Sequence, residues 1–114
     1  MSLDEIYDDM LDKQASVFIT NNVDLIQEVN SHARVDPFAS DLSGFVYRCR
    51  CPFATHTDFG TPMLLNPSRK MYYCSDCCVA GNVSGFIQLK LDCSPGAANR
   101  YLANKYDLEL PRVL

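Results

Sequence analysis

The sequence predicts a single α+β domain spanning residues 1–114, in which a zinc ribbon on a small antiparallel β-sheet is flanked by N-terminal and C-terminal helices. Three observations predict this fold: two short pairs of metal-ligand residues, strand-like segments around them, and helical periodicity before and after them. We expect an acidic helical part over residues 1–41, the ribbon over 42–81, and C-terminal helices over 82–114 that pack on the sheet.

The metal-ligand residues form a Cys-x4-His-x17-Cys-x2-Cys array made of Cys51, His56, Cys74 and Cys77. This set suits Zn²⁺, because the ion asks only for a tetrahedron of thiolate and imidazole ligands. The stretch between the two pairs is long enough to fold back, so both pairs can meet at one ion. Four protein ligands leave no position for water, and we therefore expect one structural Zn²⁺ and no catalytic metal.

Two alternatives to this ligand set stay open. Cys49 lies two residues before Cys51, so either sulfur could belong to the first pair, and Asp58 could supply an oxygen in place of His56. Cys49 follows aromatic residues at the spacing of a strand, which favours a small apolar role on the packed face.

Six cysteines in 114 residues could also form a disulfide framework. However, the first residues are acidic rather than a basic and apolar leader, and no apolar run approaches the length of a membrane span. We therefore expect a cytoplasmic protein with reduced thiols and no membrane association.

Two helices are expected before the ribbon. Ser2 and Glu5 form a capping box, and apolar residues then recur at i, i+3, i+4, i+7 and i+8 from position 3 to position 11. A second helix is expected to begin near residue 21 or 22 and to end before Pro37.

Strand signals lie at residues 45–50, 63–65 and 71–74. Residues 41–44 predict a turn before the first strand, and residues 66–68 predict a hairpin turn between the last two. After the ribbon, a turn at residues 81 and 82 leads into an apolar helix. Ser94 then caps another helix, which has Pro95 at its first position.

The charge is divided along the chain, although the formal net charge is −4. Residues 1–41 contain nine acidic residues against Lys13 and Arg34, a net of −7. Residues 42–90 contain Asp58 and Asp76 against five basic residues, a net of +3. This division favours a nucleic-acid face on the ribbon and a protein-partner face on the N-terminal part.

Taken in order along the chain, these features resemble the zinc-binding domain at the N-terminus of bacterial DnaG-type primases. The resemblance covers roughly residues 17 to 111. It rests on a helix of the form Asp-Leu-Ile, an aromatic strand, a Cys-Pro-Phe segment with a His, a Thr-Pro turn, an aromatic strand that runs into Cys-x-x-Cys, and Gly-Asn before an apolar helix. In this chain those features are Asp24-Leu25-Ile26, Phe45-Val46-Tyr47, Cys51-Pro52-Phe53 with His56, Thr61-Pro62, Tyr72-Tyr73-Cys74 with Cys77, and Gly81-Asn82.

The chain departs from the family pattern in two places. Four residues separate Cys51 from His56, where the family usually has two, so His56 has to bulge toward the metal. Asp76 and Cys78 stand where the family usually has glycines. Asp tolerates the left-handed conformation better than most residues, so Asp76 need not break the turn.

The resemblance implies a module that binds the single-stranded DNA template and assists a separate catalytic primase subunit or domain in primer synthesis during DNA replication, with a replicative helicase complex as a further partner. It also implies that the chain alone is not an enzyme, because the family's polymerase chemistry lies in a distinct domain. Aromatic and cationic side chains on a sheet can stack bases and follow phosphates. Our candidate DNA contacts are Arg48, Arg50, Lys70 and Tyr72.

The alternative function is a zinc-stabilised protein-interaction adaptor or regulator with little DNA binding, which the negative net charge favours. Salt dependence separates the two functions, because DNA binding through phosphates weakens steeply with salt whereas helix docking need not. Both a stand-alone module and a fragment of a longer primase fit the resemblance.

Overall fold

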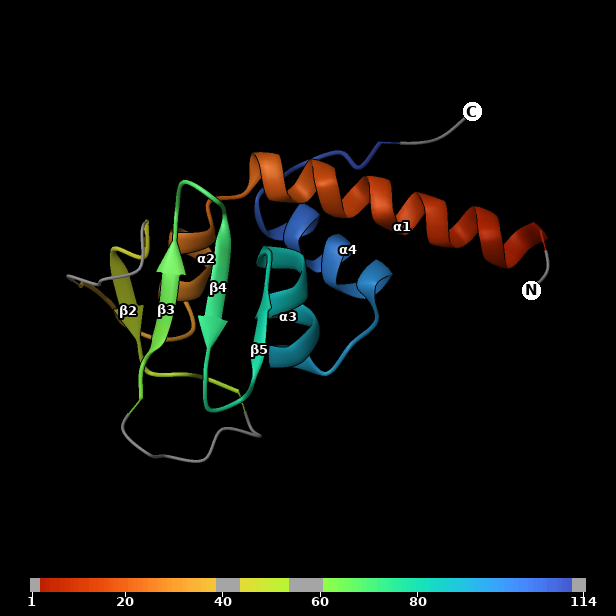
Figure 1. Cartoon of the computed structure of the whole chain (residues 1–114). Helices are drawn as coiled ribbons and strands as arrows, with labels where there is room; N and C mark the ends of the chain where they lie inside the picture. The colour runs from red at the N-terminus through yellow and green to blue at the C-terminus, as the bar shows by residue number, and fades with distance from the viewer. Residues whose placement is uncertain (1–2, 39–43, 54–60, 112–114) are drawn as a thin grey trace.

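The computed structural model describes residues 3–38, 44–53 and 61–111. Its described part contains a five-stranded antiparallel sheet whose strands lie in chain order: β1 (Val35–Pro37), β2 (Tyr47–Cys49), β3 (Met63–Asn66), β4 (Met71–Cys74) and β5 (Val79–Gly81). The helices are α1 (Leu3–Asn22), α2 (Leu25–Asn30), α3 (Val83–Leu91) and α4 (Pro95–Lys105) (Figure 1). The predicted α+β class, with helices before and after a small antiparallel sheet, is confirmed.

The boundary between the first two helices lies later than predicted. Helix α1 continues to Asn22, whose side-chain amide donates to the Phe18 carbonyl at 2.8 Å and so closes the end of this helix. Asp24 caps α2 instead, because its carboxylate accepts hydrogen bonds from the backbone N–H groups of Ile26 and Gln27. The prediction that a helix begins at residue 21 or 22 is therefore wrong.

Two edge strands were not predicted. Strand β1 occupies the segment where only a helix end was expected, and β5 runs into the turn expected at residues 81 and 82 and includes Gly81. Each has three residues, which is too short to show an alternating pattern. Pro37 is tolerated in β1 because an edge strand needs fewer backbone donors. Strand β2 is also shorter than the segment predicted at 45–50, and most of the turn predicted at 41–44 lies outside the described residues.

Both C-terminal helices begin with an N-cap, and the one at Ser94 was predicted. Asn82 caps α3 by accepting from the Gly85 N–H at 2.9 Å, and Ser94 caps α4 by accepting from the Ala97 N–H at 3.2 Å. Pro95 occupies the first turn of α4, where its missing N–H costs nothing. In both helices the first turn is therefore stabilised by a hydrogen bond between the cap side chain and the backbone N–H three residues later.

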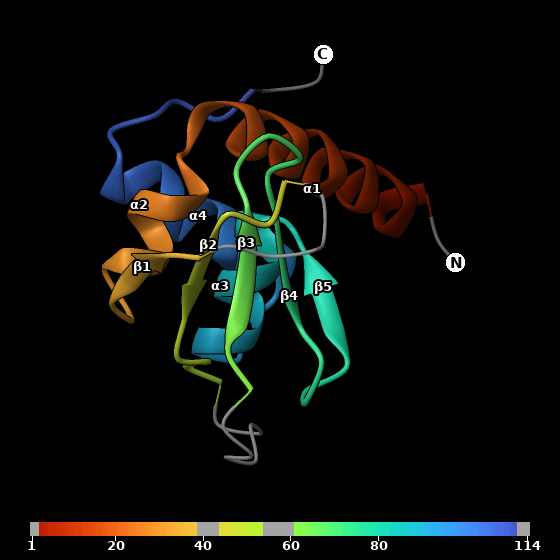
Figure 2. The ribbon, with the colours of Figure 1, turned by 60° about the vertical axis from the view of Figure 1, so that its left-hand side comes forward.

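One face of the sheet packs against helices, and no helix in the described part of the chain covers the other face. Helix α3 contacts β4 and β5 and lies behind the strands in Figure 2. On the packed side, Cys49 lies opposite Met63, and Leu65 lies opposite Tyr72; all four are buried. Since neighbouring side chains in a strand point to opposite faces, the residues between them face the other way.

Helix α2 is fastened to the end of α4 by a fully buried carboxylate. The Glu28 Oε1 atom accepts hydrogen bonds from the Tyr106 hydroxyl at 2.6 Å and from the Lys105 ammonium at 2.8 Å. His32 Nε2 lies 2.7 Å from Oε2. Burial alone would raise the pKa of Glu28, but the hydrogen bonds from Lys105, Tyr106 and His32 together lower it below its ordinary value.

The C-terminal half of α1 packs against α3 and α4 through polar as well as apolar contacts. The buried Asn99 amide donates to Ser16 Oγ at 3.2 Å, and the buried Ser84 hydroxyl donates to Asn99 Oδ1 at 2.8 Å. Ile19 is fully buried one turn further along. In the described part of the chain, no helix combines the length and the apolar character needed to cross a membrane.

Candidate functional site

Three of the four predicted metal ligands come together at one end of the sheet. Cys51 lies just after β2, Cys74 is the last residue of β4, and Cys77 lies in the turn that leads to β5. Their three sulfur atoms all lie within 4.8 Å of one another. Cys51 and Cys74 are buried and Cys77 is half-buried, so the cluster opens to solvent mainly on the Cys77 side.

The spacing of the sulfurs fits a zinc ion. The Sγ atoms of Cys51 and Cys77 are 3.8 Å apart. Two thiolates bound to Zn²⁺ at about 2.3 Å with a tetrahedral angle between them lie about 3.8 Å apart. Burial raises the pKa of the Cys51 thiol, and its hydrogen bonds with Cys74 and Cys77 raise it further. A bound zinc ion therefore has to displace protons from these sulfurs.

The turn that carries Cys77 places its left-handed residue at an unexpected position. Cys78 has φ of 56°, while Asp76 is not among the described residues with positive φ. The Cys78 N–H donates to the Ser75 carbonyl at 3.3 Å and closes the turn. Cys78 therefore adopts the left-handed backbone conformation that a glycine would adopt more easily at this position. Its side chain is exposed and does not crowd the core.

Three aromatic rings pack against one another in the core next to the cysteine cluster. The ring centroids of Phe53, Tyr72 and Phe86 lie 5.4 to 5.8 Å apart in tilted and edge-on contacts. Tyr72 is only 2% exposed, and burial, followed by the nearby Cys51 thiol, raises its pKa to about 12. We therefore correct the prediction that Tyr72 contacts DNA, because its enclosed ring has no free face on which a base could stack.

Cys49 lies in the core rather than in the sulfur cluster. It is buried on the packed face of β2 and belongs to the same apolar core as Phe53 and Tyr72. Burial, and to a lesser degree Cys74, raises its pKa to about 12. Its sulfur is not one of the three that cluster, so the structure places Cys49 in the small apolar position that the sequence predicted. His56, predicted as the fourth ligand, and its alternative Asp58 lie outside the described residues.

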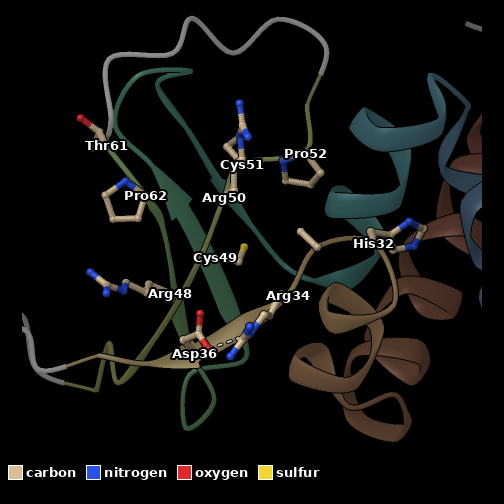
Figure 3. Close-up of a pocket in the computed structure, with 11 residues that line it drawn as sticks. His32, Arg34, Asp36, Arg48, Cys49, Arg50, Cys51, Pro52, Thr61 and Pro62 are labelled. Atoms are coloured by element: carbon tan, nitrogen blue, oxygen red, sulfur yellow. Dashed lines mark hydrogen bonds and ion pairs between the residues drawn. The ribbon is translucent and has the colours of Figure 1, made fainter.

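Arg48 and Arg50 line a depression of about 740 Å³ beside the metal cluster. Arg48 is exposed within β2 and Arg50 is exposed just after it, on either side of the buried Cys49. Figure 3 shows both guanidinium groups reaching outward from this strand in different directions, and Arg34 pairing with Asp36. Both arginines are therefore exposed, but only Arg48 lies within the strand.

Lys70 lies apart from the two arginines. Its ammonium donates to the Asn21 side-chain oxygen at 3.2 Å, at the end of α1. It lines a different hollow, which the end of α1 and the start of α2 form with the turn between β3 and β4. The structure therefore divides the four predicted DNA contacts among an arginine pair, a distant lysine and a buried tyrosine.

Sequence reasoning missed the aromatic residues that accompany Arg48 on the exposed side of the sheet. The strand register places Arg48 opposite Leu64, and Leu64 opposite Tyr73. Tyr73 is 36% exposed and makes an edge-on contact with Phe45 at 6.4 Å, while the Arg48 guanidinium lies 5.3 Å from the centre of the Phe38 ring. We call this surface the open face and define it as Phe38, Phe45, Arg48, Leu64 and Tyr73.

The sequence contained one signal for this arrangement. Tyr72 and Tyr73 are adjacent in a strand, so one of them has to face the core and the other solvent. Cys74, a ligand at a buried site, lies two residues after Tyr72 and therefore shares its face. The alternation from Cys74 thus indicates that Tyr73, rather than Tyr72, is the exposed ring.

Comparison with known proteins agrees with this site and fold. The family model of the CHC2 zinc finger of DnaG matches residues 3–113 of the chain, which therefore belongs to the CHC2 zinc finger family of DnaG-type primases. The chain is 26% identical over 92 residues to a DNA primase of Aquifex aeolicus, an alignment that covers 81% of this chain. It also resembles the crystal structure of the Aquifex aeolicus primase zinc-binding and RNA polymerase domains, with a TM-score of 0.69 and 25% identity over 86% of this chain.

The matched region is a small part of each relative. The chain spans 17% of the length of the Aquifex aeolicus DNA primase and 23% of the chain in the crystal structure. The described structure and the family match together define a zinc-binding domain of primase type.

Proposed function

We propose that this chain binds the single-stranded DNA template through the open face and assists a separate catalytic primase subunit in primer synthesis. The observation that carries the proposal is the combination of the exposed Tyr73, the half-buried Phe45 ring and the exposed Arg48 on the side of the sheet that no described helix covers. Membership of the primase zinc finger family supports it. A role at the replication template would place the protein in the cytoplasm, where we propose that a replicative helicase complex is a further partner.

The chemistry of the open face suits a flexible single strand. Tyr73 and Phe45 offer ring surface on which successive bases can stack without regard to sequence. Arg48 shares the open face with these rings, and Arg50, which is exposed just after β2, lines the same depression as Arg48; both can neutralise phosphates. The net charge of the whole chain, −4, works against long-range attraction of DNA, so we propose that binding depends on these local contacts.

We propose that one zinc ion, held by Cys51, Cys74, Cys77 and His56, keeps this surface in shape. The sulfurs join the end of β2 to the end of β4, which are the strands that carry Arg48 and Tyr73. A closed set of four protein ligands makes the ion a structural staple without a site for substrate. In this account the chain is not an enzyme on its own, and the polymerase chemistry belongs to the catalytic partner.

The DNA contacts are tested by fluorescence anisotropy of a labelled single-stranded oligonucleotide titrated with zinc-loaded protein. We expect saturable binding that weakens as salt rises, with a slope that falls by about 0.7 for each phosphate contact removed. Tyr73→Ala should weaken binding by about tenfold, because stacking on one ring contributes about 1–3 kcal/mol. Arg48→Ala should weaken binding and also reduce the salt slope.

Two matched variants control this experiment. Tyr73→Phe keeps the ring and should bind as the unaltered chain does, and Arg100→Ala removes an exposed arginine from α4, away from the open face. Equal losses in Arg48→Ala and Arg100→Ala would show that only general charge matters. Absence of binding at low salt would instead favour the zinc-stabilised adaptor, a function that the acidic N-terminal part supports.

The proposed ligand set is tested by X-ray absorption spectroscopy of the zinc-loaded chain. We expect three sulfurs and one nitrogen around one zinc per chain, and we expect His56→Ala to remove the nitrogen signal. Cys49→Ser should leave both the spectrum and the zinc content unchanged, because Cys49 is not one of the three clustered sulfurs. Four sulfurs would identify Cys49 as a ligand, and an oxygen in place of the nitrogen would point to Asp58.

A further inference from the structure

Helix α1 carries an exposed apolar stripe that the domain's own core does not use. Leu3 is 84% exposed, Ile6 41%, Met10 49% and Val17 62%. These four residues, which we call the α1 stripe, recur at spacings of three, four and seven along the helix. A repeat of three and four is the spacing of the seam along which two helices pack in a coiled coil.

The α1 stripe is separate from the surface by which α1 joins the domain. That surface includes the buried Ala15 and Ile19, Ser16 at the polar contact with Asn99, and the Asp12 carbonyl, which accepts from the Asn99 amide at 3.4 Å. Figure 1 shows the N-terminal half of α1 extending past α4, away from the sheet. The domain is accordingly elongated, with extents of 45 × 25 × 24 Å.

A projecting half-helix of this kind gains stability from a partner. Helical segments of two to three turns are marginal in water when no tertiary packing supports them. Exposed apolar side chains aligned on one side of such a segment are typical of a surface that another molecule covers. A partner that covered Leu3, Ile6 and Met10 would therefore bury apolar surface and stabilise the N-terminal half of α1.

The negative charge of the N-terminal half of α1 favours a positively charged partner. Residues 1–12 contain five acidic residues and no lysine or arginine. A second copy of the chain would bring two such segments together and would be opposed by their like charges. We propose that the α1 stripe docks an amphipathic helix of a partner protein, with apolar residues at heptad spacing flanked by lysine or arginine. This interaction is independent of the DNA-binding function proposed above.

The proposal is tested with two synthetic helical peptides of about three heptads, which share leucines at the seam but carry either lysine or glutamate at the flanking positions. Binding of each to the full zinc-loaded chain is followed by calorimetry. We expect the lysine peptide to bind saturably and the glutamate peptide not to bind. Ile6→Ser with Met10→Ser should weaken binding of the lysine peptide by about tenfold or more, because the seam loses two apolar contacts.

A matched pair of substitutions makes the result specific. Leu89 and Leu91 on α3 are 47% and 44% exposed, and changing both to serine removes a similar apolar surface elsewhere. Binding that survives in this pair, together with slowed hydrogen exchange over residues 3–11 in the complex, supports the proposal. Equal binding of both peptides, equal loss in both variant pairs, or a dimer of the chain alone that Ile6→Ser with Met10→Ser dissolves would overturn it.

Discussion

Replacing Cys74 by serine is expected to abolish zinc binding and the cooperative unfolding of the sheet. Cys74 is fully buried at the end of β4, and its sulfur is one of the three that cluster there. A structural zinc site contributes about 10–16 kcal/mol of binding free energy in small zinc domains. That exceeds or matches the whole stability of a typical domain, about 5–15 kcal/mol, so the ribbon cannot remain folded without its metal.

The measurement is thermal unfolding followed by circular dichroism, with zinc content determined on the same samples. Chelation of the unaltered chain should reproduce the effect of Cys74→Ser. Cys78→Ser is the matched control, because Cys78 is exposed and a serine can keep the contact with the Ser75 carbonyl. A metal-free chain that unfolds at the same temperature as the zinc-loaded chain would contradict the structural role of zinc.

Replacing Glu28 by alanine is expected to cause the second large loss, about 3–5 kcal/mol of unfolding free energy. The substitution leaves Lys105, Tyr106 and His32 without the carboxylate that joins them, and Lys105 is only one-third exposed and so only partly able to recover its hydration. Urea unfolding at pH 7 measures the loss. Because Glu28 joins α2 to the end of α4, amide hydrogen exchange should be faster in both segments of the Glu28→Ala chain than in the unaltered chain.

The same carboxylate predicts a dependence of stability on acid. The pKa of Glu28 is lowered in the folded chain, so its contribution to stability is complete above its ordinary pKa of 4.5 and is lost as the pH falls through the lower folded value. Glu28→Gln should keep most of the packing and lack this part of the acid dependence. A Glu28→Ala chain as stable as the unaltered one at pH 7 would show that the buried network contributes little.

The sequence predicted those features that local chemistry determines. The clustering of Cys51, Cys74 and Cys77, the cap at Ser94, and the strand segments around the ribbon follow from side-chain types at fixed spacings, and each is present in the described residues. Strands β1 and β5 could not be predicted, because three residues are too few for a periodic signal and their pairing depends on neighbours distant in sequence.

The main error at the site concerned which side chains of β4 point toward the core and which point toward solvent. Strand alternation places Tyr72 on the same face as the buried Cys74 and Tyr73 on the other, a signal that the prediction of Tyr72 as a DNA contact did not use; Phe86 of α3 packs against Tyr72 on the buried face. Similarly, the apolar pattern of α1 predicted a helix correctly, yet its stripe faces solvent, since α3 and α4 pack on another side. Periodicity shows which residues share a face of a helix or strand, whereas contacts with neighbouring elements decide whether that face is buried.

The most direct test of the account is a map of amide chemical-shift changes in the zinc-loaded, isotope-labelled chain as a short single-stranded DNA is added. We predict that the changes concentrate on the open face, at Phe45, Arg48, Leu64 and Tyr73, and leave α1 largely unaffected. Changes confined to the helices, or none at low salt with DNA in molar excess, would contradict the claim that this sheet face binds the template.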